Sequence, residues 1–438
     1  MNFYDKLKLV KRLKQRKKIE WLKLDNASKV FPALANYKDT KVFRLACELY
    51  EAVDPEILQQ ALDTVIKTYP LYQSVLRRGI FWYYLESSDI KPEIEIESTV
   101  VCAPLYFKDK KTLLFRVSYY NNRINLEVFH ALSDGVGALK FMGDLVYHYI
   151  NFKHDEITLN KAPKLYHSGS LSQQMDDSFG RYYSGGDAIK SLIEKLKTKR
   201  QARAYQIKGS TLDDNRTVII EGSMSARAVL DEAHAHNATL TVFIASLFIY
   251  SIYKDMHVNS RKQRIVLQIP VNLRQFYESE TMRNFFGSMG VAYYFTENGS
   301  SLDDIVPCVR ESFHEELKEE NLGKQLNGFM SLERSLLLRI FPLPLKDMIL
   351  RTADRIVDRR VTALVSNIGR IAIPEELSAY IRQFSVANSA KRPQIILCSF
   401  GDRLAVSFSS PFREMEIQRI FFEYLSKKGI SIEISSNR

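Results

Sequence analysis

The pattern that most restricts the fold lies in residues 112–130, where two β-patterned runs, TLLFRVSYY and RINLEVFH, flank Asn121-Asn122. Asparagine tolerates the positive φ of a tight turn, so this stretch predicts an antiparallel hairpin. Strand side chains alternate in direction, so the apolar residues 124, 126 and 128 share one face with His130. The second strand is therefore expected to direct the His130 imidazole toward the protein interior.

Directly after this strand comes Asp134-Gly135, followed by VGALKFMGDLVYHYI (136–150), whose apolar spacing indicates a helix packed on the sheet. An imidazole on the inner face of a strand end can take a proton from a hydroxyl or thiol near neutral pH. Asp134 could orient that imidazole, or it could form a buried ion pair that holds the turn. Gly135 permits a backbone conformation or a close approach that a β-carbon would forbid. The residues alone also allow a plain core histidine beside an ordinary Asp-Gly turn.

The chain has 438 residues, 45% of them hydrophobic, which is enough for a large core and favours two domains. Residues 166–215 are polar and carry Gly and Ser, so we expect a linker or crossover there, between lobes at 21–165 and 216–438. Both lobes mix strand and helix patterns, which predicts two α/β layered units. The first lobe is expected to hold a helix at 53–70, capped at Asp54, and a strand at 77–86. In the second lobe we expect strands at 217–222, 264–273, 362–369, 394–401 and 403–410, and helices at 225–237, 239–254 and 414–429.

The net charge is +11 with a pI near 9.2, which favours anionic partners without naming one. Residues 1–20 are predicted to form a basic helix. It could touch anionic lipid, or it could simply be a solvated helix at the start of the domain. No apolar core of about 7–15 residues follows, so no signal peptide is expected. The basic residues of this segment are Lys6, Lys8, Lys11, Arg12, Lys14, Arg16, Lys17 and Lys18.

Two apolar stretches and the cysteines bear on location. The stretch 238–253 is shorter than the roughly 20 residues that span a bilayer, and it is expected to be a buried core helix. The stretch 332–351 reads as a core helix broken at Pro342 and Pro344, or alternatively as a lipid-facing patch. The cysteines lie far apart and are expected to be reduced core thiols of a cytoplasmic protein. They are Cys47, Cys102, Cys308 and Cys398.

Several functional classes find no support in the sequence. His234 and His236 stand two residues apart, a spacing that does not place two metal ligands on one helix face, so no metal site is expected. The basic start lacks the interleaved aromatics that stack on bases, and no nucleic-acid motif or phosphate-binding glycine loop occurs. We therefore expect no nucleic acid as partner.

The stretch FHALSDGVGALKFM (129–142) resembles the HxxxDG motif of the coenzyme A-dependent acyltransferase superfamily, which includes chloramphenicol acetyltransferase and peptide-synthetase condensation domains. Three further blocks resemble bacterial alcohol acetyltransferase-like members, in the same order. They are WLKLDNASKVFP (21–32), IPVNLRQFYESETMRNFFG (269–287) and LVSNIGRIAIP (364–374). Four ordered blocks are far more specific than one motif.

The resemblance implies an enzyme of two chloramphenicol-acetyltransferase-like lobes that form a V-shaped monomer with a channel between them. Acyl-CoA would be the donor substrate, an alcohol or amine the acceptor, and no cofactor would be bound permanently. His130 would be the general base of a direct transfer without an acyl-enzyme. Asp134 would be structural or orienting, paired with an arginine, and Gly135 would leave room in the channel.

The same resemblance suggests further site residues. Arg274 is the first candidate for the partner of Asp134, with Arg77 behind it. Ser366 and Asn367 are candidates for hydrogen-bond donors to the oxyanion of the reaction. Asn272 and Arg274 could also contact substrate, or they could anchor a structural loop.

Two departures from the family pattern keep a second function open. Phe129 stands where many relatives have a first histidine, and Gln73 stands where relatives often have an arginine. The rival is a catalytically silent, condensation-domain-like protein that binds a ligand, carrier protein or membrane. Within the enzyme hypothesis, a thioester on an acyl carrier protein competes with free acyl-CoA as donor.

Overall fold

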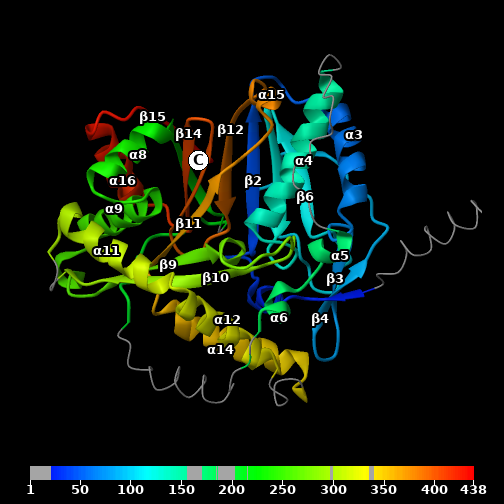
Figure 1. Cartoon of the computed structure of the whole chain (residues 1–438), viewed down its shortest axis with the longest axis horizontal. Coiled ribbons are helices and arrows are strands. Elements are labelled where there is room, and N and C mark those ends of the chain that lie inside the picture. The colour runs from blue at the N-terminus through cyan, green and yellow to red at the C-terminus, as the bar shows by residue number, and fades with distance from the viewer. Residues whose placement is uncertain are drawn as a thin grey trace, which may run out of the picture.

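A computed structural model describes residues 21–154, 170–183, 185, 203–214, 216–295, 299–334 and 340–438. The chain forms two α/β lobes, each built on its own large sheet (Figure 1). The fold class is therefore the one predicted. The basic segment 1–20 and parts of the predicted linker 166–215 lie outside the described residues.

The sheet of the N-terminal lobe has the strand order β12-β2-β7-β6-β5, antiparallel except for the parallel β5–β6 pair. Its strands are β2 (Val42–Leu49), β5 (Glu95–Ile96), β6 (Phe115–Tyr120), β7 (Arg123–Phe129) and β12 (Ile381–Asn388). The predicted hairpin is confirmed, because β6 and β7 pair around a turn in which Asn121 has a φ of 51°.

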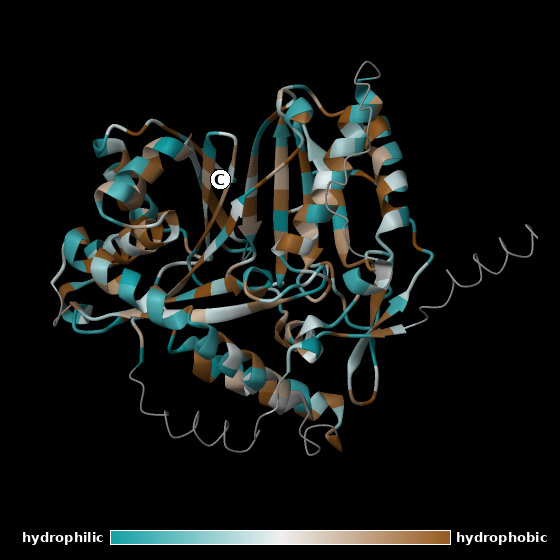
Figure 2. Ribbon diagram, in the orientation of Figure 1, coloured by the Kyte–Doolittle hydropathy of each residue, from teal (hydrophilic) through white to brown (hydrophobic). Residues whose placement is uncertain are grey.

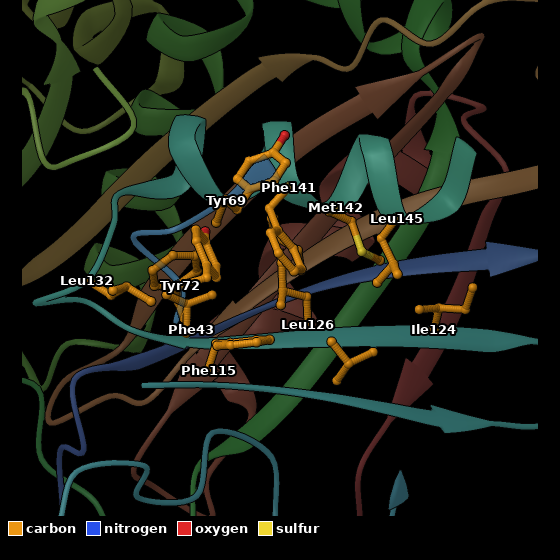
Figure 3. Packing of buried hydrophobic residues seen from close by; sticks show 14 of the residues in the cluster. Phe43, Tyr69, Tyr72, Phe115, Ile124, Leu126, Leu132, Phe141, Met142 and Leu145 are labelled. Carbon is orange, nitrogen blue, oxygen red and sulfur yellow. The ribbon is translucent and has the colours of Figure 1, made fainter. Parts of the chain in front are cut away.

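Helices cover one face of this sheet. They are α3 (Pro55–Val65), continued by η2 (Ile66–Thr68), and α4 (Gly135–Lys153). Asp54 caps α3 as expected, since its carboxylate accepts the N–H groups of residues 56 and 57. Ile124 and Leu126 of β7 are fully buried in the same cluster as Phe141 and Leu145 of α4 (Figure 3). The apolar face of β7 is thus the core face, as its alternation predicts.

The opposite face of β7 is also buried. Glu127 accepts hydrogen bonds from Arg44 at 3.0 and 2.8 Å and pairs with Arg116. Arg44 also pairs with Glu97 at 2.5 Å. Both faces of β7 are therefore packed, which holds in place the strand that leads to His130.

Residues 77–86 were expected to be one strand, and this is wrong. They are the end of β3 (Ser74–Arg78), a turn at 79–82, and most of β4 (Tyr83–Ser87), which pair as a hairpin. The Gly79 N–H donates to the Trp82 carbonyl, and a β-carbon on Gly79 would lie 2.8 Å from that oxygen. The aromatic residues made this segment look like one strand, so the prediction missed a turn that depends on Gly79. Strand β1 (Trp21–Lys23) completes the small sheet β1-β4-β3.

The C-terminal lobe has a sheet of order β10-β9-β11-β13-β14-β8-β15. Its strands are β8 (Val218–Ser225), β9 (Ile265–Asn272), β10 (Phe286–Tyr293), β11 (Ala363–Arg370), β13 (Gln394–Phe400), β14 (Arg403–Ser410) and β15 (Ile432–Ser436). The helices that share its apolar core are α8 (Ala226–Ala235), α9 (Leu240–Asp255), α11 (Leu302–Glu316), α12 (Glu319–Arg334) and α16 (Glu416–Lys427). The expected buried helix is α9, whose apolar residues are almost all inaccessible. No single described helix is long and apolar enough to cross a bilayer, and α8 and α9 reach that length only as a pair bent by 77°.

The two lobes share a strand. β12 comes from the C-terminal half but pairs antiparallel with β2 in the N-terminal sheet. The lobe boundary expected at residue 216 therefore assigns β12 to the C-terminal lobe, although this strand belongs to the N-terminal sheet. The remaining short elements are η1 (Ala27–Val30), α2 (Phe31–Leu34), α5 (Leu171–Gln174), α6 (Ser178–Arg181), η4 (Val258–Ser260), η5 (Leu273–Gln275) and α15 (Glu375–Ser378).

The helix expected within 332–351 breaks where the prolines predict, because α14 (Leu343–Asp358) starts directly after Pro342 and has Pro344 in its first turn. Its burial was predicted wrongly. Met348 and Ile349 are exposed, so α14 is a surface helix whose apolar side chains are partly in solvent. The cysteines are free thiols, and all but the half-buried Cys308 are buried.

Candidate active site

His130 directly follows β7, and its backbone N–H donates to the Lys41 carbonyl at 2.8 Å. Its imidazole is stacked on Phe31, with ring centroids 4.5 Å apart at 18°, and lies 5.1 Å from Phe43 and 5.7 Å from Phe286. The side chain thus points inward, as the alternation predicts. Burial lowers the pKa of His130, which keeps the ring neutral and able to accept a proton at pH 7.

The amide of Asn284 sets the tautomer of this ring. Its Nδ2 donates to the His130 carbonyl and to Ser28 Oγ, both at 2.8 Å, and its Oδ1 lies 3.0 Å from His130 Nδ1. A carbonyl can only accept, so Nδ2 must face it and Oδ1 must face the ring. His130 Nδ1 therefore carries the proton, and Nε2 keeps its lone pair. None of the described residues hydrogen-bonds to Nε2.

The chain of hydrogen bonds continues to a buried carboxylate. Ser28 Oγ donates to Asp25 Oδ2 at 2.5 Å, and the Ser28 N–H donates to Asp25 Oδ1 at 2.7 Å. Asp25, Ser28 and Asn284 are all at most 1% exposed. The chain His130–Asn284–Ser28–Asp25 thus holds the imidazole through Nδ1 and ends on the Asp25 carboxyl group, which also pairs with Arg283 at 3.5 Å.

Sequence reasoning did not assign Asn284, Ser28 or Asp25 to the site. A signal was nevertheless present, because the blocks 21–32 and 269–287 that carry the family resemblance contain these three residues. The fold brings both blocks to His130.

Asp134 does not hydrogen-bond to His130. Its Oδ1 caps α4 by accepting the Gly137 N–H at 3.0 Å. Its Oδ2 accepts from Arg274 Nη1 at 2.7 Å and from the Phe285 N–H at 2.9 Å. The predicted pairing with Arg274 is confirmed, and Arg77 instead pairs with Glu86 at 2.9 Å.

Arg274 is fully engaged by the protein. Its Nε and Nη2 donate to the Thr281 carbonyl, and Nη2 also donates to that of Arg283 at 2.7 Å. Asn272 Oδ1 accepts the Arg274 N–H at 3.1 Å. For Asn272 and Arg274 the geometry therefore favours the loop-anchoring alternative over substrate contact.

Two glycines let α4 approach its neighbours. A β-carbon on Gly135 would lie 3.0 Å from Ile368 Cδ1, at the end of a flexible side chain of β11. A β-carbon on Gly137 would lie 2.2 Å from the Met282 carbonyl oxygen. Gly135 thus adjoins the C-terminal lobe, and Gly137, which sequence reasoning passed over, is the more tightly constrained of the two.

The structure separates Ser366 from Asn367. Ser366 pairs in register with Ile396, which packs in the N-terminal core, and Ile368 packs on the same core. Ser366 thus lies on the side of β11 that carries Ile368, whose side chain is the one that approaches Gly135. Asn367 points to the other side, where its amide donates to Thr241 Oγ1 at 2.8 Å and its Oδ1 accepts the Gly369 N–H. Of these two candidates, only Ser366 is on the His130–Gly135 side.

Residues 182–398 match the alcohol acetyltransferase family. This range contains Arg274, Asn284 and Ser366 but not the HxxxDG block. No curated protein matches the chain. Among solved structures, polyketide synthase associated protein 5 from Mycobacterium tuberculosis is 13% identical with a TM-score of 0.63, over 92% of this chain and 96% of that one.

Two further structures are similar over almost the whole chain. The trichothecene 15-O-acetyltransferase from Fusarium sporotrichioides is 10% identical with a TM-score of 0.64, over 93% of this chain and 94% of that one. A variant of the starter condensation domain of rhizomide synthetase, in complex with C8-CoA, is 12% identical with a TM-score of 0.65, over 95% and 96%. At these identities the likeness establishes the fold.

Proposed function

We propose that the chain is a coenzyme A-dependent acyltransferase that moves an acyl group from a thioester to an alcohol or amine, with His130 as general base. The match of residues 182–398 to the alcohol acetyltransferase family and the likeness to acyltransferase and condensation-domain structures support this. One observation carries the proposal. His130 Nδ1 is bound by Asn284, and this bond leaves the Nε2 lone pair available in a ring whose pKa is lowered by burial.

In the proposed reaction, His130 Nε2 takes the proton from the acceptor O–H or N–H as the acceptor atom attacks the thioester carbonyl carbon. The carbonyl oxygen becomes an oxyanion in a tetrahedral intermediate. The intermediate then collapses, the C–S bond breaks, and the departing thiolate takes the proton from His130. The products are an ester or amide and a free thiol, and no acyl-enzyme forms.

The imidazolium that forms during this transfer is supported by Asn284 Oδ1, which accepts from Nδ1, and by the chain that ends at Asp25. The hydroxyl of Ser366, on the Gly135 side of β11, is the proposed donor to the oxyanion. Asp134 and Arg274 act at a distance from the reacting atoms by fixing the N-terminus of α4 against the loop 281–285.

Acyl-CoA is the proposed donor, supported by the similar condensation domain in complex with C8-CoA. A thioester on a carrier protein has the same reacting group, and the likeness to polyketide synthase associated protein 5 and to condensation domains keeps it as the second donor to test. The rings of Phe31, Phe43 and Phe286 around His130 favour an acceptor with apolar groups next to its nucleophile.

The test is acceptor-dependent thiol release from acetyl-CoA and longer acyl-CoAs with a panel of alcohols and amines. His130→Ala is expected to lower kcat/KM by about 10²–10⁴-fold, the usual contribution of a general base. The matched control is His148→Ala, a histidine further along α4 whose pKa is also lowered by burial, and this variant is expected to stay near wild type.

Turnover that is indifferent to His130 would refute the assignment. If no acyl-CoA reacts, carrier-protein thioesters are tested next. Acyl-CoA binding by a wild-type protein that turns over neither donor would favour the silent binding protein instead.

A further inference from the structure

Helix α14 turns apolar side chains outward. Met348, Ile349 and Ile356 are 57%, 43% and 47% exposed. Positions 345, 349, 352 and 356 recur every three or four residues, so Ile349 and Ile356 lie on one face of the helix. We refer to the side of α14 formed by Met348, Ile349 and Ile356 as the α14 outer face.

The acidic residues of α14 lie on its inner side. Asp347 is buried and accepts a hydrogen bond from the Tyr83 hydroxyl at 2.8 Å. Asp354 and Asp358 both pair with Lys391, at 2.8 and 2.7 Å. An ordinary surface helix keeps its apolar side chains on the inner side, whereas α14 leaves Met348, Ile349 and Ile356 in solvent. An exposed apolar face of this kind marks an interaction surface.

The tip of the β3–β4 hairpin extends this face. The Ile80 carbonyl accepts the Leu343 N–H at 2.8 Å, and the Phe81 carbonyl accepts from Lys346 Nζ at 2.9 Å. Ile80 is 75% exposed, Phe81 42%, and Ile340, just before α14, is 69% exposed. Figure 2 shows apolar residues at this hairpin tip and at the neighbouring end of α14. The apolar hairpin tip thus adjoins the N-terminal end of α14.

A row of arginines borders the outer face. Arg351, Arg355 and Arg359 are spaced by four residues along α14 and are all exposed. Within the described part of the chain, no carboxylate pairs with Arg355 or Arg359. The charge around the α14 outer face is therefore positive.

We propose that the α14 outer face, the hairpin tip and the arginine row form a docking surface for anionic membrane lipid. Isoleucine, methionine and phenylalanine side chains would enter the boundary between headgroups and acyl chains, as in interfacial amphipathic helices. The arginines would contact lipid phosphates, whose negative charge they complement. The proposal is independent of the acyl-transfer chemistry.

Charge argues against the two nearest alternatives. In a twofold dimer through this face, the arginine row of one copy would meet the same surface of the other, so like charges would be brought together. Residues 1–20 carry eight Lys or Arg against two Asp or Glu, so this segment would also be repelled. An anionic surface complements the α14 outer face in both charge and hydrophobicity.

The test is flotation of the full-length protein with phosphatidylcholine vesicles, with and without phosphatidylglycerol. Wild type is expected to float with the anionic vesicles. The double variant Ile349→Asp/Ile356→Asp is expected to lose at least about tenfold in partitioning, since two apolar side chains no longer leave water. The matched control Val258→Asp/Ile434→Asp, at exposed apolar positions elsewhere, should float like wild type.

The charge contribution is tested separately. Arg355→Gln/Arg359→Gln is expected to weaken binding by roughly fivefold per charge removed, and Arg227→Gln/Lys262→Gln should not weaken it. The proposal is overturned if wild type does not float, or if the face variants bind like their controls.

Two further results would assign the surface differently. If neutralising the basic residues of segment 1–20 removes all vesicle binding while Ile349→Asp/Ile356→Asp retains it, the α14 face is not the lipid site. Light scattering is run in parallel on the same proteins. Self-association of wild type that disappears in the isoleucine variant would identify a second copy as the occupant and overturn the proposal.

Discussion

Asp134 and His130 are four residues apart in one motif, yet their surroundings differ completely. Both oxygens of Asp134 are occupied, by the N–H groups of residues 137 and 285 and by the Arg274 guanidinium. His130 has one ring nitrogen bound to Asn284, and its other nitrogen has no hydrogen-bond partner in the described ranges. The aspartate is saturated and the histidine is not.

This difference supports the proposal that His130, and not Asp134, takes part in the chemistry. A side chain whose hydrogen-bonding capacity is fully used stabilises the fold, whereas reaction requires an atom that is still free to bind substrate. The motif alone does not separate these roles, because either residue could have oriented the other. The contacts at residues 274, 284 and 285, far away in sequence, favour a structural role for Asp134 and support His130 as the proposed base.

The largest expected effect on stability is that of Asp134→Ala. The substitution removes the α4 cap and leaves buried Arg274 without its partner, so we expect about 3–5 kcal/mol loss in the free energy of unfolding. Denaturant unfolding measures this, with His130→Ala as the comparison, expected to cost less than about 2 kcal/mol. Asp134→Ala/Arg274→Met should regain part of the loss, since no buried charge is left unpaired. Equal destabilisation by Asp134→Ala and His130→Ala would mean that Asp134 stabilises the fold no more than His130 does.

The next effect is on catalysis. Asn284→Ala removes the acceptor for the imidazolium that forms during transfer, and a hydrogen bond to a charged group contributes about 1.5–3 kcal/mol. We therefore expect kcat/KM to fall by about 10–150-fold. Asn367→Ala is the matched control, because its amide is bound to Thr241 on the far side of β11. A rate unchanged by Asn284→Ala would mean that the buried chain does not support the base.

Much of the fold follows from local patterns in the sequence. Alternation in residues 123–129 fixes the direction of His130, and the Asp54-Pro55 pair marks the start of α3. Asn284 could not be found in this way, because its bond to His130 joins residues 154 positions apart. Only the packing of the 281–285 loop against β7 and α4 brings them together.

Helix α14 shows a second limit of local patterns. Leu343 is buried on one side and Ile349 and Ile356 are exposed on another, so its periodicity does not identify the inner face. That choice is made by Asp354 and Asp358, whose partner Lys391 lies in the loop between β12 and β13. Long-range ion pairs thus decide what the apolar pattern leaves open.

The pH dependence of the rate tests whether His130 acts as the base. Burial lowers the pKa of His130, and the base must be unprotonated to act. We expect kcat/KM to be level at high pH and to fall about tenfold per pH unit below a midpoint lower than about 6.5. Phe31→Ala opens the ring to water and should move this midpoint upward. A wild-type midpoint above the ordinary histidine value would contradict the assignment.

The same group affects stability with a defined sign. Below about pH 6.5 the unfolded chain binds a proton that folded His130 resists, so its contribution to stability decreases as the pH falls. Unfolding curves at two pH values on either side of 6.5 would show this, and His130→Ala should remove the difference due to this group.

The smallest expected effect is that of Gly135→Ala. The new β-carbon would meet only the flexible end of Ile368 at 3.0 Å, so we expect a loss below about 1 kcal/mol in unfolding free energy. Gly137→Ala is the more severe substitution, because its β-carbon would lie 2.2 Å from a backbone carbonyl oxygen. We expect it to lower the free energy of unfolding by at least about 1–3 kcal/mol. If Gly135→Ala nevertheless lowers kcat/KM strongly while stability is kept, the space at Gly135 is needed by substrate. That result would place the acyl-transfer site between α4 and β11, whereas equal losses of stability in both variants would make Gly135 a packing residue.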